Sequence, residues 1–349
     1  MSNKGPLAAT AALLAAGLLA TACSSNSSTT AGGSGSGSAS ASASSTASGS
    51  TTSLSNVTLN VGDQAGSGAQ ALLTAAGLIG KLPFRVHWSD FTSGPPMLQA
   101  MGAGSVDIGA VGDAPPIFAA AGGEKIAAVA ATENNATATA LLVPEGSSIH
   151  SVAQLRGKKI AVAEGSASDY HLVAVLKQAG LTPKDVTIVN LQPAQAAAAF
   201  ASGQVDAWDV WSPFLEQAEG QHGARALVDW APVGKEYAFE VASRAALANP
   251  AKAAAIRVYL KLIAQAHAWA DTHQSAWAQT WSKATGLPLS IMTKAADDDT
   301  SQTVPISPAV ISSQQAIANV FTAAGLIPGH VDFASFAVTT FNGTAGSSS

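Results

Sequence analysis

The stretch WSDFTSGPPMLQAMGAGSVDIGAVGDAPPIFAAA, from Trp88 to Ala121, indicates more about the fold than any other part of the chain. A Ser-Gly-Pro-Pro turn leads into a helix, a buried strand follows, and a Gly-Asp-Ala-Pro-Pro turn leads into a second helix. Each turn presents a helix N-terminus, where unpaired backbone N–H groups and the helix dipole favour an anion. Two such N-termini after successive strands predict a small, preformed pocket that accepts an anion.

Short β-branched runs alternate with alanine-rich helical stretches along the rest of the chain. This alternation predicts an α/β fold with mostly parallel sheets flanked by helices. Glycine readily adopts the left-handed conformation of a helix C-cap, so helices are expected to end at Gly77, Gly180 and Gly325. The expected strands are residues 57–61, 84–88, 106–111, 126–130, 138–143, 159–162, 186–191 and 205–210.

Composition limits the classes of function. The chain has 349 residues, of which 47% are hydrophobic and 11% charged, so it can bury the cores of two domains. Its net charge of −5 and its scattered lysines and arginines provide no basic face, so no nucleic-acid partner is expected. Beyond Ala248 the pattern is helical, with Asn249 as N-cap and Pro250 in the first position. The later tryptophans 269, 277 and 281 are expected to pack within a helical layer.

The N-terminal residues have the pattern of an export signal. A lysine and an apolar run precede small residues and the chain's only cysteine, Cys23. This pattern predicts residues 1–22 as a lipoprotein signal peptide and Cys23 as an acylated first residue, with an ordinary signal peptide as the alternative. Residues 23–54 are expected to be a Ser/Gly/Ala-rich tether and residues 341–349 a disordered tail. The protein is then expected to be extracytoplasmic and lipid-anchored to the cell membrane.

No motif for catalysis or metal binding is evident. The seven histidines form no His-Glu-x-x-His and no cluster at metal spacing, so neither a metal nor a cofactor is expected. A nucleophile elbow, a phosphate loop and a dinucleotide fingerprint are also missing, and Ser166 and His171 face different directions on one expected helix. The chain is therefore not expected to be an enzyme. Residues 297–299, all aspartate, lack a calcium-loop pattern and are expected at a solvated helix end or loop.

Three turns that lead into helices are expected to meet at the carboxyl ends of strands. Two belong to the opening stretch, at Thr92–Pro96 and Gly112–Pro116, and the third is Glu164–Tyr170. Glycines allow close backbone approach, hydroxyls donate to an oxyanion, and the N-terminal amides complete the site. Each turn alone is explained by helix capping. Together they match the crevice in which open α/β sheets bind ligands.

A fourth candidate is the strand and turn from Val205 to Phe214. Alternation along the strand places Asp209 and Trp211 on one face and Trp208 on the other. Core packing and ligand contact both explain the tryptophans. An aspartate between two tryptophans, however, is unusual for packing alone.

These segments resemble those of substrate-binding proteins that serve ABC importers of aliphatic sulfonates, taurine and nitrate, above all the sulfonate branch. The resemblance rests on the opening stretch and on LRGKKIAVAEGSASDYHLVAVLKQAGL, QAAAAFASGQVDAWDVWSPFLEQAE, VASRAALANP and SPAVISSQQAIANVFTAAGLIP, which follow one another in family order. It implies a two-lobed periplasmic-binding-protein fold of type II. Lobe 1 would comprise residues 56–145 and 245–340, and lobe 2 would comprise residues 146–244.

The resemblance also implies the ligand and the partners. A monomeric protein without a cofactor would clamp a small anionic or zwitterionic organosulfur ligand between its lobes and deliver it to an ABC permease of the cytoplasmic membrane. Taurine, nitrate and a thiamine-precursor pyrimidine are alternative ligands, and an enzyme on the same fold is a rival function. The expected ligand-binding residues are Gln64, Ser93, Gly94, Gly112, Asp113, Ala114, Gly165, Ser166, Ala167, Ser168, Trp208, Asp209, Trp211, Tyr237, Phe239 and Glu240.

One position departs from the family pattern. The family usually has two apolar residues between its tryptophans and then Trp-Asp-Pro, whereas Asp209 here replaces the first apolar residue and Ser212 replaces the aspartate. A carboxylate within about 4 to 6 Å of a sulfonate would oppose its binding. We therefore expect Asp209 to pair with a cation carried by the ligand, such as an ammonium.

Overall fold

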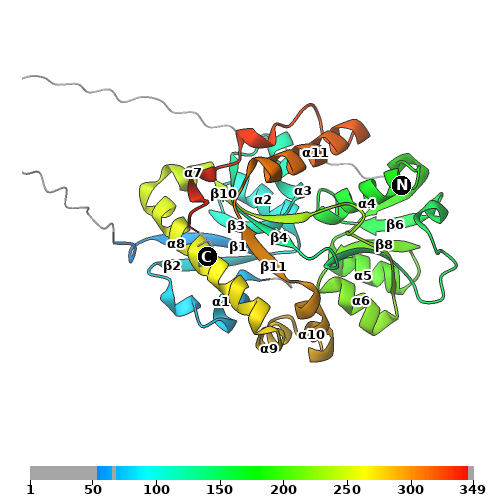
Figure 1. Cartoon of the computed structure of the whole chain (residues 1–349), viewed down its shortest axis with the longest axis horizontal. Coiled ribbons are helices and arrows are strands. Elements are labelled where there is room, and N and C mark those ends of the chain that lie inside the picture. The colour runs from blue at the N-terminus through cyan, green and yellow to red at the C-terminus, as the bar shows by residue number, and fades with distance from the viewer. Residues whose placement is uncertain (1–52, 65–67, 345–349) are drawn as a thin grey trace, which may run out of the picture. The chain divides into compact units, whose positions relative to one another are not determined.

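The computed structural model describes residues 53–64 and 68–344. The predicted signal peptide, Cys23, nearly all of the expected tether and the tail from residue 345 onward lie outside the described residues. From Thr51 onward the chain forms one unit, which contains two β-sheets flanked by helices and confirms the α/β class (Figure 1). Within the described ranges, no helix combines the length and hydropathy needed to cross a membrane.

The first sheet has six strands in the order β11-β4-β10-β3-β1-β2. In this sheet β1 pairs in parallel with β2 and β3, whereas β10 pairs antiparallel with β3 and β4, and β11 antiparallel with β4. We call this sheet and the helices that cover it lobe 1. Its strands are β1 (Thr58–Gln64), β2 (Arg85–Phe91), β3 (Ile108–Gly112), β4 (Ile126–Asn134), β10 (Glu236–Ser243) and β11 (Ser301–Val304).

The second sheet has five strands in the order β7-β6-β8-β5-β9. In it β6 pairs in parallel with β7 and β8, whereas β5 pairs antiparallel with β8 and β9. This sheet and its helices form lobe 2. Its strands are β5 (Thr139–Val143), β6 (Lys159–Val162), β7 (Thr187–Asn190), β8 (Ala207–Trp211) and β9 (Arg225–Asp229).

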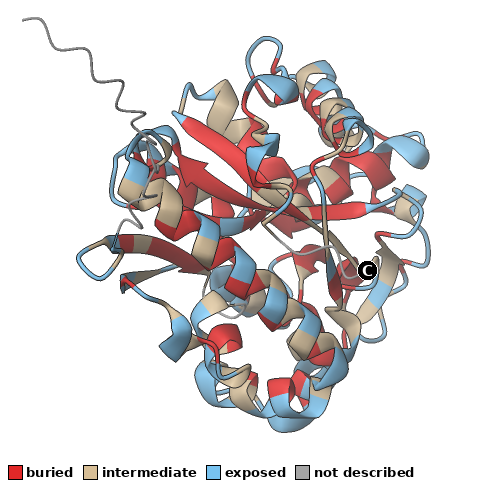
Figure 2. Cartoon of the chain, turned by 60° about the vertical axis from the view of Figure 1, so that its left-hand side comes forward, coloured by how far each residue is buried: buried red, intermediate tan, exposed pale blue. Residues whose placement is uncertain are grey.

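Helices cover both faces of each sheet, so most strand residues are buried beneath helices whose outward faces are exposed (Figure 2). One face of the first sheet is covered by α1 (Ala69–Ala75), α8 (Pro250–Thr272), α9 (Gln274–Thr285) and α10 (Leu289–Asp298), and the other by α2 (Gly94–Gly102), α3 (Ala114–Ala121) and α11 (Pro308–Ala324). In lobe 2, α4 (Ala167–Gln178) covers one face, and α5 (Pro193–Ala201) and α6 (Phe214–His222) cover the other. The short α7 (Arg244–Ala248) links β10 to α8.

Local sequence signals account for the helix boundaries. The side chain of Asn249 accepts hydrogen bonds from two backbone N–H groups at the start of α8, as predicted. Trp277 and Trp281 stack at 4.9 Å in the core, which confirms that they pack within a helical layer. Gly77, Gly180 and Gly325 have φ angles of 66°, 72° and 72°. These angles are left-handed, as predicted for glycines that end helices.

The chain crosses between the lobes twice, and both crossings differ from the expected boundaries near residues 145 and 245. Because β5 belongs to the second sheet and β10 to the first, the crossings are residues 135–138 and 230–235. Each crossing leads into a strand that pairs antiparallel, so both sheets are mixed and not mostly parallel. The residue pattern marks a strand but does not show which sheet the strand will join.

Candidate functional site

A cavity of about 180 Å³ lies where the two lobes meet. Its walls are the strand ends of the first sheet, one side of α8, the beginnings of α2 and α4, and strands β5 and β8. The polar residues that line it include Gln64, Thr132, Asn134, Glu236, Glu240, His267, Asp299 and Ser301 from lobe 1, and Thr139, Ser166 and Ser212 from lobe 2.

The structure brings half of the expected ligand-binding residues to this cavity. Those that line it are Gln64, Gly94, Gly112, Ser166, Ala167, Trp211, Phe239 and Glu240. The others lie behind the lining or on the opposite faces of their strands, as Trp208 does in the core of lobe 2 and Tyr237 in the core of lobe 1. Those outside the lining are Ser93, Asp113, Ala114, Gly165, Ser168, Trp208, Asp209 and Tyr237.

Two helix N-termini, one from each lobe, reach the cavity. α2 begins at Gly94, after Ser93 in extended conformation, and has prolines in its first turn. α4 begins at Ala167, and the hydroxyl of its N-cap Ser166 accepts a hydrogen bond from the Asp169 N–H. The first-turn N–H groups of α4, the Gly94 N–H of α2 and the dipoles of both helices favour an anion in the space between the lobes, although Pro95 and Pro96 of α2 have no N–H.

The lobes are in close contact beside these N-termini. A Cβ atom added to Gly112, at the end of β3, would lie 2.9 Å from the Cβ of Ala167, at the start of α4. Only glycine at this position allows the two backbones to approach so closely. Gly112 therefore has a steric role at the boundary between the lobes.

A second contact between the lobes involves Gln192, which precedes α5. Its Oε1 accepts hydrogen bonds from Thr92 Oγ1 at 2.9 Å and from Ser93 Oγ at 2.7 Å. Gln192 also lines a second hollow of about 520 Å³, together with Gly165. The second hollow is larger, but the cavity is the better candidate site because both helix N-termini and several buried carboxylates line it.

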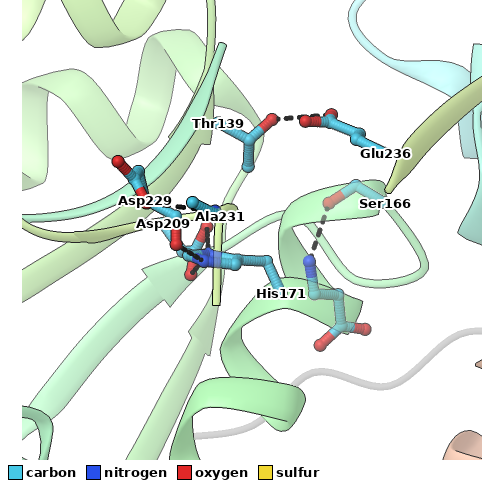
Figure 3. A network of polar contacts seen from close by, with 8 residues as sticks. Thr139, Ser166, His171, Asp209, Asp229, Ala231 and Glu236 are labelled. Atoms are coloured by element: carbon cyan, nitrogen blue, oxygen red, sulfur yellow. Dashed lines mark hydrogen bonds and ion pairs between the residues drawn. The ribbon is translucent and has the colours of Figure 1, made fainter. Parts of the chain in front are cut away.

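Asp209 has a partner within the protein and does not line the cavity. Its carboxylate lies 2.8 Å from Nδ1 of His171, and both side chains are fully buried (Figure 3). Nε2 of His171 contacts the backbone oxygen of Asp229, and its ring stacks on Trp230 at 5.4 Å. Burial lowers the pKa of His171, but the Asp209 carboxylate more than offsets this, so that pKa lies above its ordinary value. The structure therefore gives Asp209 an internal partner and does not support its expected pairing with a ligand cation.

The carboxylates that do reach the cavity come from β10. Glu236 and Glu240 are 5% and 7% exposed, and Oε2 of each has no hydrogen-bond partner among the described residues. Oε1 of Glu236 accepts a hydrogen bond from Thr139 at 3.0 Å, which joins β10 to β5 (Figure 3). Burial raises the pKa of Glu236 to about 8, with a further increase from Asp113, and burial raises the pKa of Glu240 to about 8, with a further increase from Asp63.

Two further titratable groups line the cavity wall that contains Glu236. Asp299, just beyond α10, lines the cavity, and burial raises its pKa to about 7. Residues 297–299 were expected at a solvated helix end or loop, and Asp299 does lie at the end of α10 as its C-cap, but it is only partly exposed and also lines the cavity. Nδ1 of His267 lies 2.9 Å from the Ser301 hydroxyl, and burial lowers the pKa of His267 to about 4.

Asp113 is buried directly behind this wall. It is fully buried, neither carboxylate oxygen has a hydrogen-bond partner among the described residues, and burial raises its pKa to about 8. It precedes α3 and does not line the cavity. Asp113 lies near Glu236 and so adds a further acidic group on the Glu236 side of the cavity.

Sequence reasoning missed Glu236, Thr139, His267 and Asp299. A period of two along β10 places Glu236, Ala238 and Glu240 on one face, so this alternation is a signal that could have found Glu236. His267 of α8 and Asp299, which precedes β11, carry no comparable signal, because only the packing of distant segments brings them to the cavity. In the described part of the chain, no group of three or more His, Cys, Asp or Glu side chains could hold a metal ion.

Comparisons with known proteins show the family and the fold of this chain. The family described as NMT1/THI5 like matches residues 93–270. A protein of Escherichia coli K12 named putative aliphatic sulfonates-binding protein is 34% identical over 277 residues, which are 78% of this chain and 86% of that protein. The solved alkanesulfonate-binding protein SsuA of Xanthomonas axonopodis pv. citri, bound to MOPS, has a TM-score of 0.75 and 31% identity, covering 81% of this chain and 99% of that one.

The same fold also occurs in an enzyme. The desulfurization enzyme DSZB matches with a TM-score of 0.59 and 15% identity, covering 82% of this chain and 98% of the enzyme. At that identity the likeness concerns the fold alone. The fold therefore does not by itself distinguish a binding protein from an enzyme.

Proposed function

We propose a function for this chain from the premise that it belongs to the NMT1/THI5-like family, in the group that includes the aliphatic sulfonates-binding proteins. It is a solute-binding protein of an ABC importer, which captures a small organosulfonate between its lobes and presents it to a membrane permease. The observation that carries this proposal is the convergence of two helix N-termini, at Gly94 in lobe 1 and Ala167 in lobe 2, on one cavity. A sulfonate held by both would join the lobes.

Hinge closure would provide the mechanism. A ligand that contacts both lobes stabilises the closed arrangement relative to the open one, and the permease recognises closure. The contact of Gln192 with Thr92 and Ser93 and the close approach of Gly112 to Ala167 form only when the lobes are together. No covalent chemistry is required.

The proposed ligand class is a small anionic or zwitterionic organosulfur compound. The helix N-termini favour a tetrahedral oxyanion without a basic side chain, and the Xanthomonas protein is described with MOPS, itself an alkanesulfonate. Taurine, nitrate and pyrimidines are alternative ligands that a binding screen separates. The named relative of E. coli is a binding protein and not an enzyme, which favours binding over catalysis for this chain.

The site of action would be outside the cytoplasm. Residues 1–22 would direct export, and Cys23 would be acylated and would anchor the protein to the membrane beside the permease. Labelling cells with a fatty acid that carries a chemical tag tests this anchor. The wild-type protein is expected to carry the label, Cys23→Ala is expected to lose it, and an unlabelled wild type would contradict the lipid anchor.

A thermal-shift screen tests the ligand class. The panel comprises alkanesulfonates, taurine, sulfate esters, nitrate and pyrimidines. A ligand at about 100 times its dissociation constant adds about 2.7 kcal/mol to the free energy of unfolding, which gives a clear rise in Tm. Alkanesulfonates are expected to raise the Tm. If none of the sulfur compounds raises it, the sulfonate assignment is wrong, and a response to nitrate or to a pyrimidine would identify the alternative.

A further inference from the structure

The cavity wall formed by β10 presents carboxylates to the site. Glu236, Ala238 and Glu240 alternate along the strand and line the cavity, whereas Tyr237 and Val241 contribute to the core on the opposite face. Over four residues the two carboxylates lie about 13 Å apart along the strand, at about 3.3 Å per residue. They therefore form a wall along the cavity and not a single cluster.

These carboxylates lack partners within the protein. Both side chains are more than nine-tenths buried, and Oε2 of each has no hydrogen-bond partner in the part of the chain that the structure describes. A buried carboxylate without a partner costs several kcal/mol when it is charged. Glu236 has one hydrogen bond, from Thr139, and Glu240 has none in the described ranges.

No cation of the protein compensates this wall. Among the described residues that line the cavity, none is lysine or arginine, and the low pKa of His267, about 4, leaves its ring neutral near pH 7. Charged and titratable groups surround both glutamates. Asp63 of β1 and Tyr259 of α8 lie near Glu240, and Asp113, His171 and Asp299 lie near Glu236. Of these only His171 can carry a positive charge, and Asp209 already pairs with it.

We propose that the β10 wall is a subsite for an ammonium group, with Glu240 as its main partner. The ligand would then be a zwitterion with a sulfonate at one end and a protonated amine at the other. The inference rests on the proposed sulfonate function for the anionic end only. It transfers the cation-pairing role expected of Asp209 to residues that line the cavity.

The two ends of such a ligand would contact different faces of the first sheet within one cavity. The first residue of α2, Gly94, lies against Val111, since a Cβ on Gly94 would be 3.0 Å from Val111 Cγ1. Val111 of β3 is paired with Phe239 of β10, the residue next to Glu240. Glu240 itself lies on the other face of the first sheet, beside Tyr259 of α8, whereas Gly94 packs on the face that α2 covers. Because Gly94 and Glu240 both line the cavity, a ligand that reaches both must extend past the strand ends, which favours the longer aminoalkanesulfonates.

Titration calorimetry of the full chain with matched ligand pairs tests the subsite. Each ω-aminoalkanesulfonate of two to five carbons is compared with the alkanesulfonate of the same length, so the two differ only by the ammonium. The variants are Glu240→Gln and Glu236→Gln, with Glu133→Gln as the matched control, because Glu133 also lies beside β10 but pairs with Lys235 outside the cavity. Circular dichroism shows that each variant is folded.

The expected result is a preference of at least tenfold for the amino form at one or more lengths. Glu240→Gln should remove most of this preference while keeping or strengthening the binding of plain alkanesulfonates, and Glu133→Gln should keep the wild-type ratio. Because a bound ammonium favours the ionised glutamate, repeating the titration in buffers of different ionisation enthalpy should show release of protons.

Three results would overturn the subsite. The first is an equal affinity for both members of every pair, and the second is a ratio that Glu240→Gln leaves unchanged. The third is a preference for plain sulfonates with uptake of protons, which would mean that neutral carboxylic acids donate hydrogen bonds to the anion. If no sulfonate binds, the proposed function fails instead, and propylamine tests the subsite alone. A response to propylamine that depends on Glu240 would support it, and the lack of any response would overturn it.

Discussion

Two buried acidic sites, one in each lobe, differ in how their carboxylates are accommodated. In lobe 2, Asp209 is fully buried and lies 2.8 Å from Nδ1 of His171, which is held in turn by Asp229 and Trp230. In lobe 1, Glu236 and Glu240 are nearly as buried, but one oxygen of each has no partner among the described residues. Asp209 is thus satisfied within the protein and the two glutamates are not. The contrast holds for these sites and not for whole lobes, because Asp107 of lobe 1 pairs with Lys252 and Oε2 of Glu216 in lobe 2 has no partner among the described residues.

This difference separates a structural acid from a binding acid. A paired buried carboxylate fixes the arrangement of its neighbours, so its removal should cost folding stability. An unpaired carboxylate on a cavity wall makes the empty protein less stable, and a ligand can offset that cost. Replacing the paired carboxylate should therefore lower folding stability. Replacing an unpaired carboxylate on the cavity wall should lower ligand affinity and leave folding stability unchanged or higher.

The largest expected effect is the destabilisation by Asp209→Ala. This change leaves His171 buried without its counter-ion, which costs about 3–5 kcal/mol of the free energy of unfolding. Chemical denaturation at pH 6, where His171 is protonated, measures the loss. Glu240→Gln is the matched control: with a folded-state pKa of about 8, Glu240 is neutral at pH 6 and holds a proton that the unfolded chain releases, so its replacement should be neutral or stabilising. A loss of stability of similar size in both variants would contradict the distinction between paired and unpaired carboxylates.

The second effect is a fall in the stability of the unliganded protein as pH rises from about 5 to 8. The pKa of Glu240 is about 8 in the folded protein against an ordinary 4.5, so between these values the folded state retains a proton that the unfolded chain has released. Stability then decreases by up to about 1.4 kcal/mol per pH unit for this group.

A comparison with Glu240→Gln isolates this contribution. The raised pKa of His171 acts in the same direction, since its stabilisation is complete below its ordinary pKa and is lost as the pH passes its folded value. Subtracting the pH profile of Glu240→Gln from that of the wild type removes the His171 contribution. Parallel profiles would show that Glu240 keeps an ordinary pKa.

The sequence predicted much of the fold, because alternation and capping are local. The eight expected strands all occur, and Asn249 and the three C-cap glycines have the predicted roles. The pairing of β5 and β10 was not predictable from the residue pattern, since the partners of both strands lie far along the chain. The expected boundaries between the lobes were displaced for this reason.

The site was predicted only in part, for a similar reason. Backbone features such as the turns at Gly94 and Ala167 are encoded locally, and both line the cavity. The direction of an acidic side chain depends on what packs around it. Asp209 was expected to face the ligand, but His171, a helix residue 38 positions earlier, binds it inside lobe 2.

The third prediction concerns Gly112, where the lobes are in closest contact. In Gly112→Val a Cβ would lie 2.9 Å from the Cβ of Ala167, so the lobes could not close fully. Alkanesulfonate affinity is expected to fall at least tenfold while the free energy of unfolding changes by less than about 1.5 kcal/mol, because each lobe keeps its own core. Calorimetry and denaturation measure the two quantities. Unchanged affinity would mean that closure does not require this contact.

A smaller effect is expected from Gln192→Ala, which removes two hydrogen bonds between the lobes. Because the contact is partly exposed, each bond is taken at the low end of its net contribution, about 0.5 kcal/mol, so the two together give about 1 kcal/mol and affinity should fall roughly fivefold. Gln217→Ala is the control, because Gln217 bonds only to Gln221 on the exposed surface of α6. An equal change in both variants would show that the Gln192 contact does not favour the closed arrangement.

The smallest effect should come from Glu133→Gln, which breaks the ion pair with Lys235 beside the second crossing. The side chains are 32% and 64% exposed, so water already solvates both charges and the pair contributes less than about 1 kcal/mol. Denaturation at low salt and at 1 M salt measures it, and the difference from wild type should vanish at 1 M, where the Debye length is about 3 Å. A loss above 2 kcal/mol that persists in salt would contradict this expectation. Because Glu133 and Glu236 are on neighbouring strands of one sheet, such a loss would mean that a carboxylate beside β10 stabilises the fold whether or not it reaches the cavity.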